Sequence, residues 1–251
     1  GISVYVIDNL SSESSCESYR REDVKYFIDD IRNINKNNYE KIRFDVIYHL
    51  GALARIQPSF VDPCEYISVN SMGTAEVCEY ARKHGSRIVY AGSSSAYGGV
   101  MLNPYAFAKR SGEEICELYS KVYNTSTVVA RFFNVYGDRH PVTGPCATVV
   151  GIFEQKMVKG EPMTIIGDGE QRRDFTHVSD IVSGLIALGE KSWKSEIFNL
   201  GCGKNYSINQ LAKMFGGETT FINSRPGEAR TTLADYSEMN RATGWLPAIC
   251  L

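Results

Sequence analysis

The sequence predicts an α/β fold built on a doubly wound parallel sheet, with a smaller α/β lobe interleaved with it. Short apolar runs alternate with amphipathic helical patterns in the first half of the chain, which is typical of a parallel sheet with helices on both faces. Beyond about residue 138 the pattern is less regular, and this indicates the second lobe. With 251 residues, 43% of them hydrophobic, the chain is long enough for one large domain with such a lobe.

The main sheet and its helices are predicted from apolar runs and from helix boundary residues. The runs that predict strands lie at residues 4–7, 44–50, 87–91 and 127–133. Helices are predicted at residues 63–84 and 104–123, since both begin with proline and a glycine follows the first. Further helices are predicted at 148–159, 178–190 and 208–215, with short strands at 163–166 and 197–200.

The two regions are interleaved along the chain. We assign residues 1–137 and about 174–200 to the sheet domain, and about 138–173 and 201–251 to the smaller lobe. The polar stretch 11–18 is predicted to be a surface loop. The chain is expected to be truncated at both ends. It lacks an initiator methionine, its first residues have the pattern of a buried strand, and its last residues break off without a closing helix or strand.

Composition argues against several classes of protein. The formal net charge of -2 shows no basic bias, which argues against nucleic-acid and membrane-surface binding. No apolar run approaches the roughly 18 to 20 residues of a membrane span. The four histidines show no zinc spacing, so no metal is expected. The cysteines are scattered and form no C-x-x-C pair, which predicts reduced thiols in a cytoplasmic protein: Cys16, Cys64, Cys78, Cys116, Cys146, Cys202 and Cys250.

Tyr105 and Lys109 are candidate catalytic residues. They lie four apart in a predicted helix and therefore share a face, where the lysine charge can favour the ionised phenol. Tyrosine normally titrates near pH ~10, so it becomes a useful base at neutral pH only when its pKa is lowered. A serine from the cluster Ser93-Ser94-Ser95 would hydrogen-bond the same substrate oxygen. Taken alone, the spacing fits an exposed tyrosine and lysine on an amphipathic helix equally well.

Asp8 ends the first predicted strand. In dinucleotide-binding folds an acidic residue at the end of the second strand accepts hydrogen bonds from the adenosine ribose, which favours NAD. The alternative is a turn-forming Asp-Asn pair. The strand and glycine-rich phosphate loop that would lie roughly 20 residues upstream are absent from the sequence.

These residues and others resemble the extended short-chain dehydrogenase/reductase family, and within it the NAD-dependent nucleotide-sugar epimerases and dehydratases typified by UDP-glucose 4-epimerase. The similarity runs through nearly the whole chain. Any one motif is weak evidence, but the combined order and spacing of the motifs are specific to this family. The matching pieces are Val6-Ile-Asp8-Asn9, Asp30-Ile31-Arg32, Tyr48-His49-Leu50-Gly51-Ala52, Asn70-Ser-Met-Gly73-Thr74, Ser93-Ser-Ser-Ala-Tyr97-Gly98, Tyr105-x-x-x-Lys109, Arg131-Phe-Phe-Asn134, Arg173-Asp174-Phe, Phe198-Asn199-Leu-Gly201 and Arg225-Pro-Gly-Glu228.

The resemblance implies a Rossmann-like fold that binds NAD and a UDP-sugar. Its implied cofactor residues are Asp8 and Asn9 at the adenosine ribose, Asp30 and Ile31 beside the adenine, Leu50, Gly51 and Ala52 along the cleft, Asn70 in support, and Lys109 at the nicotinamide ribose. The implied substrate residues are Ser93, with Ser94 next to it, Asn134 at the diphosphate, Arg173 and Arg225 as its neutralising pair, Glu228, and Thr232 on the pocket wall. A homodimer formed by helices 63–84 and 104–123 is also implied, with Cys78 and Cys116 as packing residues.

The implied reaction is epimerisation at C4 of a UDP-hexose through a 4-keto intermediate. Dehydratases of this family resemble Thr-Asp-Glu after the strand, and decarboxylases tend to carry a glutamate there, whereas this chain has Ser94-Ser95-Ala96. The small Thr232 would also admit N-acetylated hexoses. Another nucleotide-sugar enzyme of the family, or a non-catalytic sugar-nucleotide-binding relative, remains the alternative. One departure is that six residues separate Gly98 from Tyr105, where relatives have about twenty that help to cover the sugar.

Overall fold

The central sheet of the protein is parallel and has the strand order β3-β4-β5-β9. The structure is a computed structural model that describes residues 1–12, 19–36, 38–249 and 251. The strands of this sheet are β3 (Val46–His49), β4 (Arg87–Ser93), β5 (Thr127–Phe132) and β9 (Lys194–Leu200). A separate parallel pair is formed by β1 (Val4–Asp8) and β2 (Val24–Ile28).

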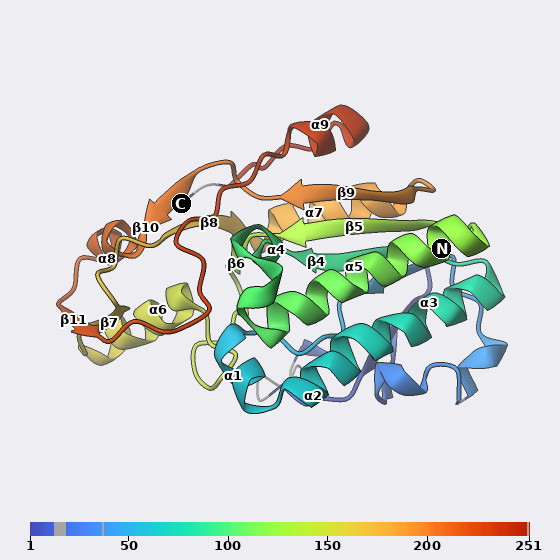
Figure 1. Cartoon of the computed structure of the whole chain (residues 1–251), viewed down its shortest axis with the longest axis horizontal. Helices are drawn as coiled ribbons and strands as arrows, with labels where there is room; N and C mark the ends of the chain where they lie inside the picture. Colours follow the sequence, from blue (N-terminus) through green and yellow to red (C-terminus); the bar gives the residue numbers. More distant parts are fainter. Residues whose placement is uncertain (13–18, 37, 250) are drawn as a thin grey trace.

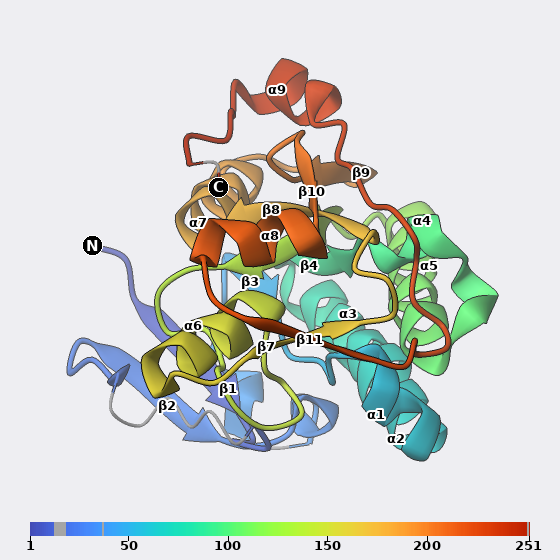
Figure 2. The same ribbon diagram turned by 90° about the vertical axis from the view of Figure 1, so that its left-hand side faces the viewer.

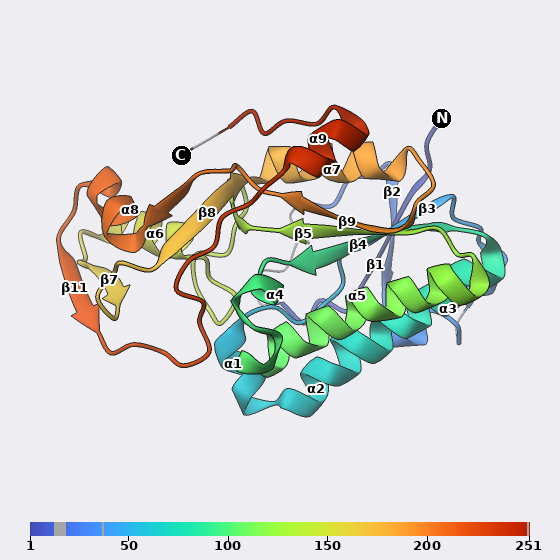
Figure 3. The same ribbon diagram turned by 45° about the horizontal axis from the view of Figure 1, so that its top comes forward.

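Helices cover both faces of the central sheet, as Figures 1 and 3 show: α3 (Gly73–His84) and α5 (Pro104–Tyr123) on one face, and α7 (Val178–Gly189) on the other. Successive residues of a strand point to opposite faces. Accordingly Ile88 and Tyr90 of β4 pack with α3 and α5, while Val89 between them packs with Leu185 of α7. The predicted doubly wound α/β fold is confirmed.

The smaller part of the molecule lies at the carboxyl ends of the central strands (Figure 1), and it faces the viewer in Figure 2. Its strands form a three-stranded sheet in the order β10-β8-β6 and a parallel pair β11-β7. Its elements are β6 (Asn134–Tyr136), α6 (Val149–Lys159), β7 (Met163–Ile166), β8 (Arg172–His177), β10 (Asn205–Ser207), α8 (Ile208–Phe215) and β11 (Thr219–Ile222). Phe153, Ile165, Phe175 and Leu211 form its core. The domain boundaries that we assign remain a prediction.

The predicted helix at 63–84 is a continuous helical segment with a change of winding in its middle. It consists of α2 (Pro63–Ile67), a π-helical turn at Ser68–Met72, and α3. Such π turns are frequent at functional sites. The short helices α1 (Ile56–Val61) and α4 (Ser95–Gly98) follow the carboxyl ends of β3 and β4, and α9 (Ser237–Thr243) packs against β9.

Several predictions of local structure need correction. β2, β6, β8, β10 and β11 were not predicted, because they are short or carry charged residues. The first strand is half-buried instead of buried, since Val4 is 46% exposed. Cys202 is disulfide-bonded, so the prediction that all cysteines are reduced thiols is wrong for this residue. The predicted surface loop at 11–18 lies largely outside the described residues, as do Cys16 and Cys250. Among the described helices, none combines the length and apolar composition of a membrane span.

Candidate active site

Tyr105 and Ser93 meet at the carboxyl end of β4. The amide oxygen of Asn103 caps α5 by accepting a hydrogen bond from the Ala106 backbone N–H at 2.7 Å. Pro104 is the first helical residue, so Tyr105 lies in the first turn of the helix. The Tyr105 hydroxyl lies 3.3 Å from Ser93 Oγ. Ser95 also donates to Ser93 Oγ, from its hydroxyl at 2.9 Å. Of the two candidate serines, Ser93 is the one that contacts Tyr105.

The charges around Tyr105 differ from the prediction. Burial raises the pKa of Tyr105, while the hydrogen bond with Ser93 and the positive charge of Arg55 oppose that rise. The Lys109 ammonium lies 4.5 Å from the centre of the Tyr90 ring. Burial lowers the pKa of Lys109 to about 8, against the influence of the Glu113 carboxylate. The predicted lowering of the Tyr105 pKa by Lys109 is therefore not seen in this structure, where the cation that acts on Tyr105 is Arg55.

A buried network holds the lysine in place. Lys109 is only 5% exposed, and the Tyr90 hydroxyl donates to its backbone carbonyl at 3.2 Å. His49, at the end of β3, lies 3.0 Å from the hydroxyl of Thr74. Thr74 in turn donates to the Asn70 carbonyl at 2.6 Å, within the π-helical turn. This network couples the end of β3 to the helices that carry Asn70 and Lys109.

His49 makes the protein sensitive to acid. Burial, aided by the charge of Lys109, lowers the pKa of His49 to about 3. In the unfolded chain it titrates near the ordinary value of ~6.5, so the unfolded state binds more protons between these values and stability falls as the pH falls. We expect a loss of about 2 kcal/mol in the free energy of unfolding between pH 7 and pH 5. Urea unfolding at both pH values measures it.

The control is His49→Gln, which keeps a polar group of similar reach and does not titrate. The difference between pH 7 and pH 5 should shrink in this variant. An equal pH dependence in both proteins would show that His49 is not the group responsible.

The residues predicted at the adenosine lie together at the ends of β1 and β2. Because the two strands are parallel, Asp8 and Ile28 are register partners. The Asn9 amide donates to the Asp30 carboxylate at 3.2 Å. Asp30 also forms a two-bond ion pair with Arg32, at 2.9 and 2.8 Å, which lowers the pKa of Asp30 to about 2. The Asp30 carboxylate is thus an ionised acceptor at neutral pH.

The residues predicted to line the cofactor cleft, Leu50, Gly51 and Ala52, lie at the end of β3, against which Ile31 packs. A Cβ atom on Gly51 would lie 2.9 Å from the Ile31 side chain, so glycine lets Ile31 approach the end of β3. Leu50 is 52% exposed, and Ala52 is half-buried beside it. The Asn70 amide both donates to the Leu53 carbonyl, at 2.9 Å, and accepts from its N–H, at 2.8 Å. The ends of β1, β2 and β3 therefore present acceptors and a fixed backbone that fit a dinucleotide.

The predicted substrate residues are only partly brought together. The Arg173 side chain is 12% exposed and lies 3.5 Å from the Glu228 carboxylate, and burial lowers its pKa. Arg225 is exposed, and within the described part of the chain no ion pair links it to Glu228, the partner of Arg173. Thr232 is 7% exposed, and its hydroxyl has no hydrogen-bond partner within the described part of the chain. Its place on the pocket wall remains a prediction.

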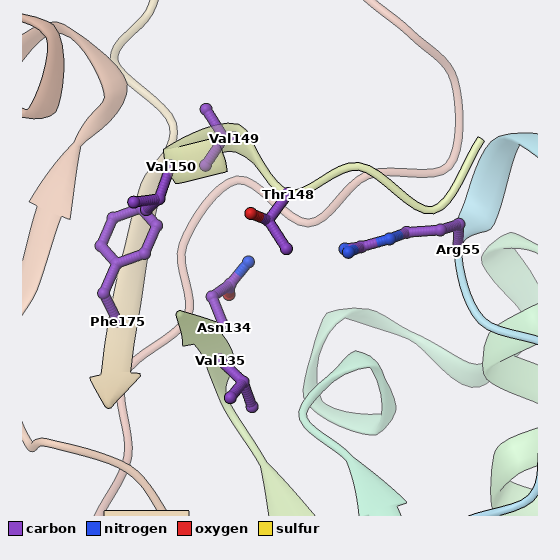
Figure 4. A pocket seen from close by; sticks show the side chains of 7 residues that line it. All are labelled: Arg55, Asn134, Val135, Thr148, Val149, Val150 and Phe175. Carbon is purple, nitrogen blue, oxygen red and sulfur yellow. The ribbon is translucent and has the colours of Figure 1, made fainter. Parts of the chain in front are cut away.

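Asn134 lines a small pocket between the two parts of the molecule. Its lining residues are Arg55, Asn134, Val135, Thr148, Val149, Val150 and Phe175. Figure 4 shows Arg55 reaching toward Asn134 and Thr148 from the opposite side of this pocket. The guanidinium of Arg55 is held by the Cys146 carbonyl, to which Nε and Nη2 donate at 3.2 and 2.7 Å.

Comparison with known proteins decides the family. Residues 1–201 match the model of the NAD dependent epimerase/dehydratase family. The chain belongs to this family. Its cofactor, NAD, is therefore the one that the sequence predicts. A putative UDP-glucose 4-epimerase of Methanocaldococcus jannaschii is 33% identical to this chain over 272 aligned residues. The alignment covers 99% of this chain and 86% of the relative.

Solved structures of epimerases have the same fold. UDP-glucose 4-epimerase of Thermotoga maritima, with UDP-glucose, matches with a TM-score of 0.92 at 29% identity, over 100% of this chain and 87% of that chain. UDP-glucuronic acid 4-epimerase of Bacillus cereus, in complex with UDP-glucuronic acid and NAD, matches with a TM-score of 0.86 at 26% identity, over 98% of this chain and 86% of that chain. These relatives are UDP-sugar 4-epimerases.

The sequence did not reveal two features of this epimerase-family site. Arg55 was not predicted, since it follows a strand in a stretch without charge clustering or motif spacing. The segment 225–229 docks across the short connection between Gly98 and Tyr105. Asn103 donates to the Gly227 carbonyl at 2.9 Å, Gln57 donates to the Pro226 carbonyl at 3.1 Å, and a Cβ atom on Gly98 would lie 2.7 Å from the Ala229 side chain. Among the described residues, no cluster of three or more candidate metal ligands occurs.

Proposed function

We propose that the protein epimerises C4 of a UDP-hexose, interconverting UDP-glucose and UDP-galactose and admitting the N-acetylated forms, through a 4-keto sugar. The contact between the Tyr105 hydroxyl and Ser93 Oγ at the end of β4 supports this most directly. It puts a general base and a hydrogen-bonding hydroxyl at one point, with a buried lysine one turn further along the same helix.

Tyr105 and Ser93 act on the C4 hydroxyl of the sugar. Tyr105 takes the proton of the C4 hydroxyl, and Ser93 hydrogen-bonds the same oxygen as it becomes a carbonyl. When bound, NAD supplies the hydride acceptor and donor for C4. After the keto sugar has turned over in the pocket, Tyr105 returns the proton to the C4 oxygen on the new face. No proton or electron is consumed over the cycle.

The rest of the site would hold the two ligands. Asp8, Asn9 and Asp30 present acceptors where the adenosine ribose and adenine are expected. The Arg173 side chain is only 12% exposed; its Nη1 donates to the Arg172 carbonyl at 3.0 Å, and its Nη2 lies 3.5 Å from Glu228, a long contact for which a diphosphate can compete. We propose Asn134 as a further diphosphate contact and Arg225, from its exposed segment, as the second cation.

The local residues favour epimerisation over elimination or decarboxylation. Those reactions need an additional acid or base beside the serine, and this chain has Ser95 and Ala96 there. The Ser95 hydroxyl donates to Ser93 Oγ, so it supports the serine. A non-catalytic binding protein would not need a buried lysine and a tyrosine paired with a serine, which argues against that alternative.

The test is the conversion of UDP-galactose to UDP-glucose by the NAD-loaded protein. We expect turnover to an equilibrium mixture without accumulation of NADH and without release of CO2. UDP-N-acetylgalactosamine, assayed in parallel, tests whether the pocket admits the larger sugar. Net NADH or CO2 would identify one of the alternative reactions, and binding without turnover would favour the non-catalytic one.

Dimerisation and location are separate proposals. We infer a homodimer in the cytoplasm, with α3 and α5 of each subunit at the interface. Sedimentation equilibrium tests the assembly: a single species of monomer mass at micromolar concentration would contradict it.

A further inference from the structure

Glu113 is a buried carboxylate that the proposed reaction does not use. It lies one turn after Lys109 on α5, and residues four apart share a helix face. Glu113 is 3% exposed and Lys109 is 5% exposed. Carboxylate and ammonium groups are rarely buried unless they are paired, so each of these two charges must be compensated by its surroundings.

Two arginines hold the Glu113 carboxylate. Arg131 of β5 donates to both carboxylate oxygens, from Nε at 2.9 Å and from Nη2 at 2.6 Å. Arg110 donates to Oε2 from Nη1 at 3.1 Å. A two-bond pair of this kind fixes the orientation of the carboxylate. Arg131 is itself packed against Tyr97, whose ring centre lies 4.8 Å from the guanidinium carbon.

Lys109 and Glu113 reach the same face of β4. The Lys109 ammonium lies over the Tyr90 ring, and a Cβ atom on Gly92 would lie 2.9 Å from Glu113 Oε1. Tyr90 and Gly92 are two residues apart in the strand, so they face the same way. Glycine at position 92 therefore lets the carboxylate lie against the strand directly before Ser93.

Glu113 supplies the negative charge that acts on Lys109. The other titratable or charged groups around the lysine come from β3, α3, β4, α5 and β5: His49, Cys78, Tyr90, Tyr105, Arg110, Cys116 and Arg131. Burial lowers the pKa of His49 to about 3 and raises the pKa of both tyrosines. The contact with Cys78 raises the pKa of Cys116. Within the described residues, Glu113 is therefore the carboxylate among these groups, and its charge opposes the loss of the Lys109 proton.

We propose that Glu113 is a positioning residue for Lys109: anchored by Arg131 and Arg110, its carboxylate keeps the lysine beside the site as a charged ammonium. The effect on turnover rests on the proposed epimerase function, whereas the effect on the lysine does not. Without the carboxylate, burial acts on Lys109 unopposed, so the lysine loses its proton at a lower pH.

The experiment compares Glu113→Gln with Glu117→Gln. Both replace a glutamate of α5 by its amide, but the Glu117 side chain is 44% exposed and pairs with Lys121 on the surface. NMR of the protein with isotopically labelled lysine follows the titration of Lys109, whose signal is the one lost in Lys109→Gln. The wild-type midpoint is expected at about pH 8. It should fall by about one pH unit or more in Glu113→Gln and stay unchanged in Glu117→Gln.

The alkaline limb of kcat/KM for UDP-galactose should move with the lysine. A charged Lys109 is present below its pKa and is lost as the pH rises through it. NAD-loaded Glu113→Gln should therefore lose activity at a lower pH than the wild type, by the same shift as the NMR midpoint. A merely structural defect would lower the activity without moving this limb.

A second variant covers the case in which Glu113→Gln does not fold. Glu113→Gln/Arg131→Met removes both partners of the buried ion pair, a change that proteins tolerate better than the loss of one partner. The Lys109 midpoint should still fall, because the charge that acts on the lysine is that of Glu113. In the wild type alone, a midpoint below pH 7 would overturn the proposal, since the lysine would not be kept charged.

The failures are distinguishable. An unchanged Lys109 midpoint in Glu113→Gln overturns the role of Glu113, whatever the protein catalyses. A lowered midpoint with an unmoved alkaline limb also overturns it, because Lys109 is then not the group that limits turnover, and it leaves the epimerase proposal standing. If no UDP-hexose turns over, the epimerase proposal fails, and the lysine midpoint alone decides the role of Glu113.

Discussion

Tyr105→Phe is expected to lower kcat for the UDP-galactose reaction by about 10³-fold or more, because phenylalanine cannot accept the C4 hydroxyl proton. KM should change little, since the ring still fills the same space beside Tyr66. Loss of the hydroxyl also removes one partner of Ser93, at 3.3 Å, but no helical hydrogen bond of α5. Coupled assay of UDP-glucose formation measures the effect.

The matched control is Tyr119→Phe. Tyr119 lies on the same helix, where its ring stacks obliquely on Tyr123 with centres 5.1 Å apart, away from Ser93. This variant should retain nearly full activity. Undiminished kcat in Tyr105→Phe would refute the proposed role of Tyr105 as the base, and equal losses in both variants would point to damage to α5.

The second large effect is expected at Asp174. This fully buried carboxylate accepts from the backbone N–H groups of Cys202, Gly203 and Ala234, at 2.8, 2.9 and 3.1 Å. It thereby joins β8 to the loop after β9 and to the segment before α9. Asp174→Ala leaves all three donors without this acceptor, and the two on the buried residues Cys202 and Ala234 cost about 1–3 kcal/mol each, so we expect a loss of at least about 2 kcal/mol in the free energy of unfolding.

Urea unfolding at pH 7 measures this loss, with Asp168→Ala as the control. Asp168 has the same side chain, but it is 57% exposed and pairs with Arg230 on the surface. Exposed ion pairs contribute little, so the control should unfold at nearly the wild-type urea concentration. Similar midpoints for both variants would contradict the joining role of Asp174.

The sequence predicted those elements whose apolar periodicity or end residues decide their structure. The helix at Pro104–Tyr123 has proline at its start, an Asn103 cap before it and a left-handed Asn124 after it, and its predicted bounds agree with the structure. β8 could not be found in this way. Its sequence, Arg172 to His177, contains one apolar residue, Phe175, and its charged Asp174 is buried where backbone donors from distant segments reach it.

Prediction of the site was limited for a similar reason. The sequence indicates that Tyr105 and Ser93 lie close together, because Tyr105 lies at the start of a predicted helix and Ser93 lies just after a predicted strand. The orientation of Lys109 toward Tyr90, by contrast, depends on packing between α5 and β4. The placement of the Arg55 guanidinium is also a tertiary effect, since it donates to the Cys146 carbonyl 91 residues away, so no local pattern could have indicated it.

The docking of segment 225–229 has a consequence for biosynthesis. Its contacts with Asn103 and Gln57 join positions 124 and 169 residues apart in the sequence. Domains begin to fold from the amino terminus during translation, and contacts between distant positions form late. The central strands β3, β4 and β5 can therefore assemble while the ribosome is still making the carboxyl-terminal part. Segment 225–229 can dock across the connection between Gly98 and Tyr105 only after nearly the whole chain has emerged, so a nascent chain truncated before residue 225 would carry Tyr105 without this docked segment.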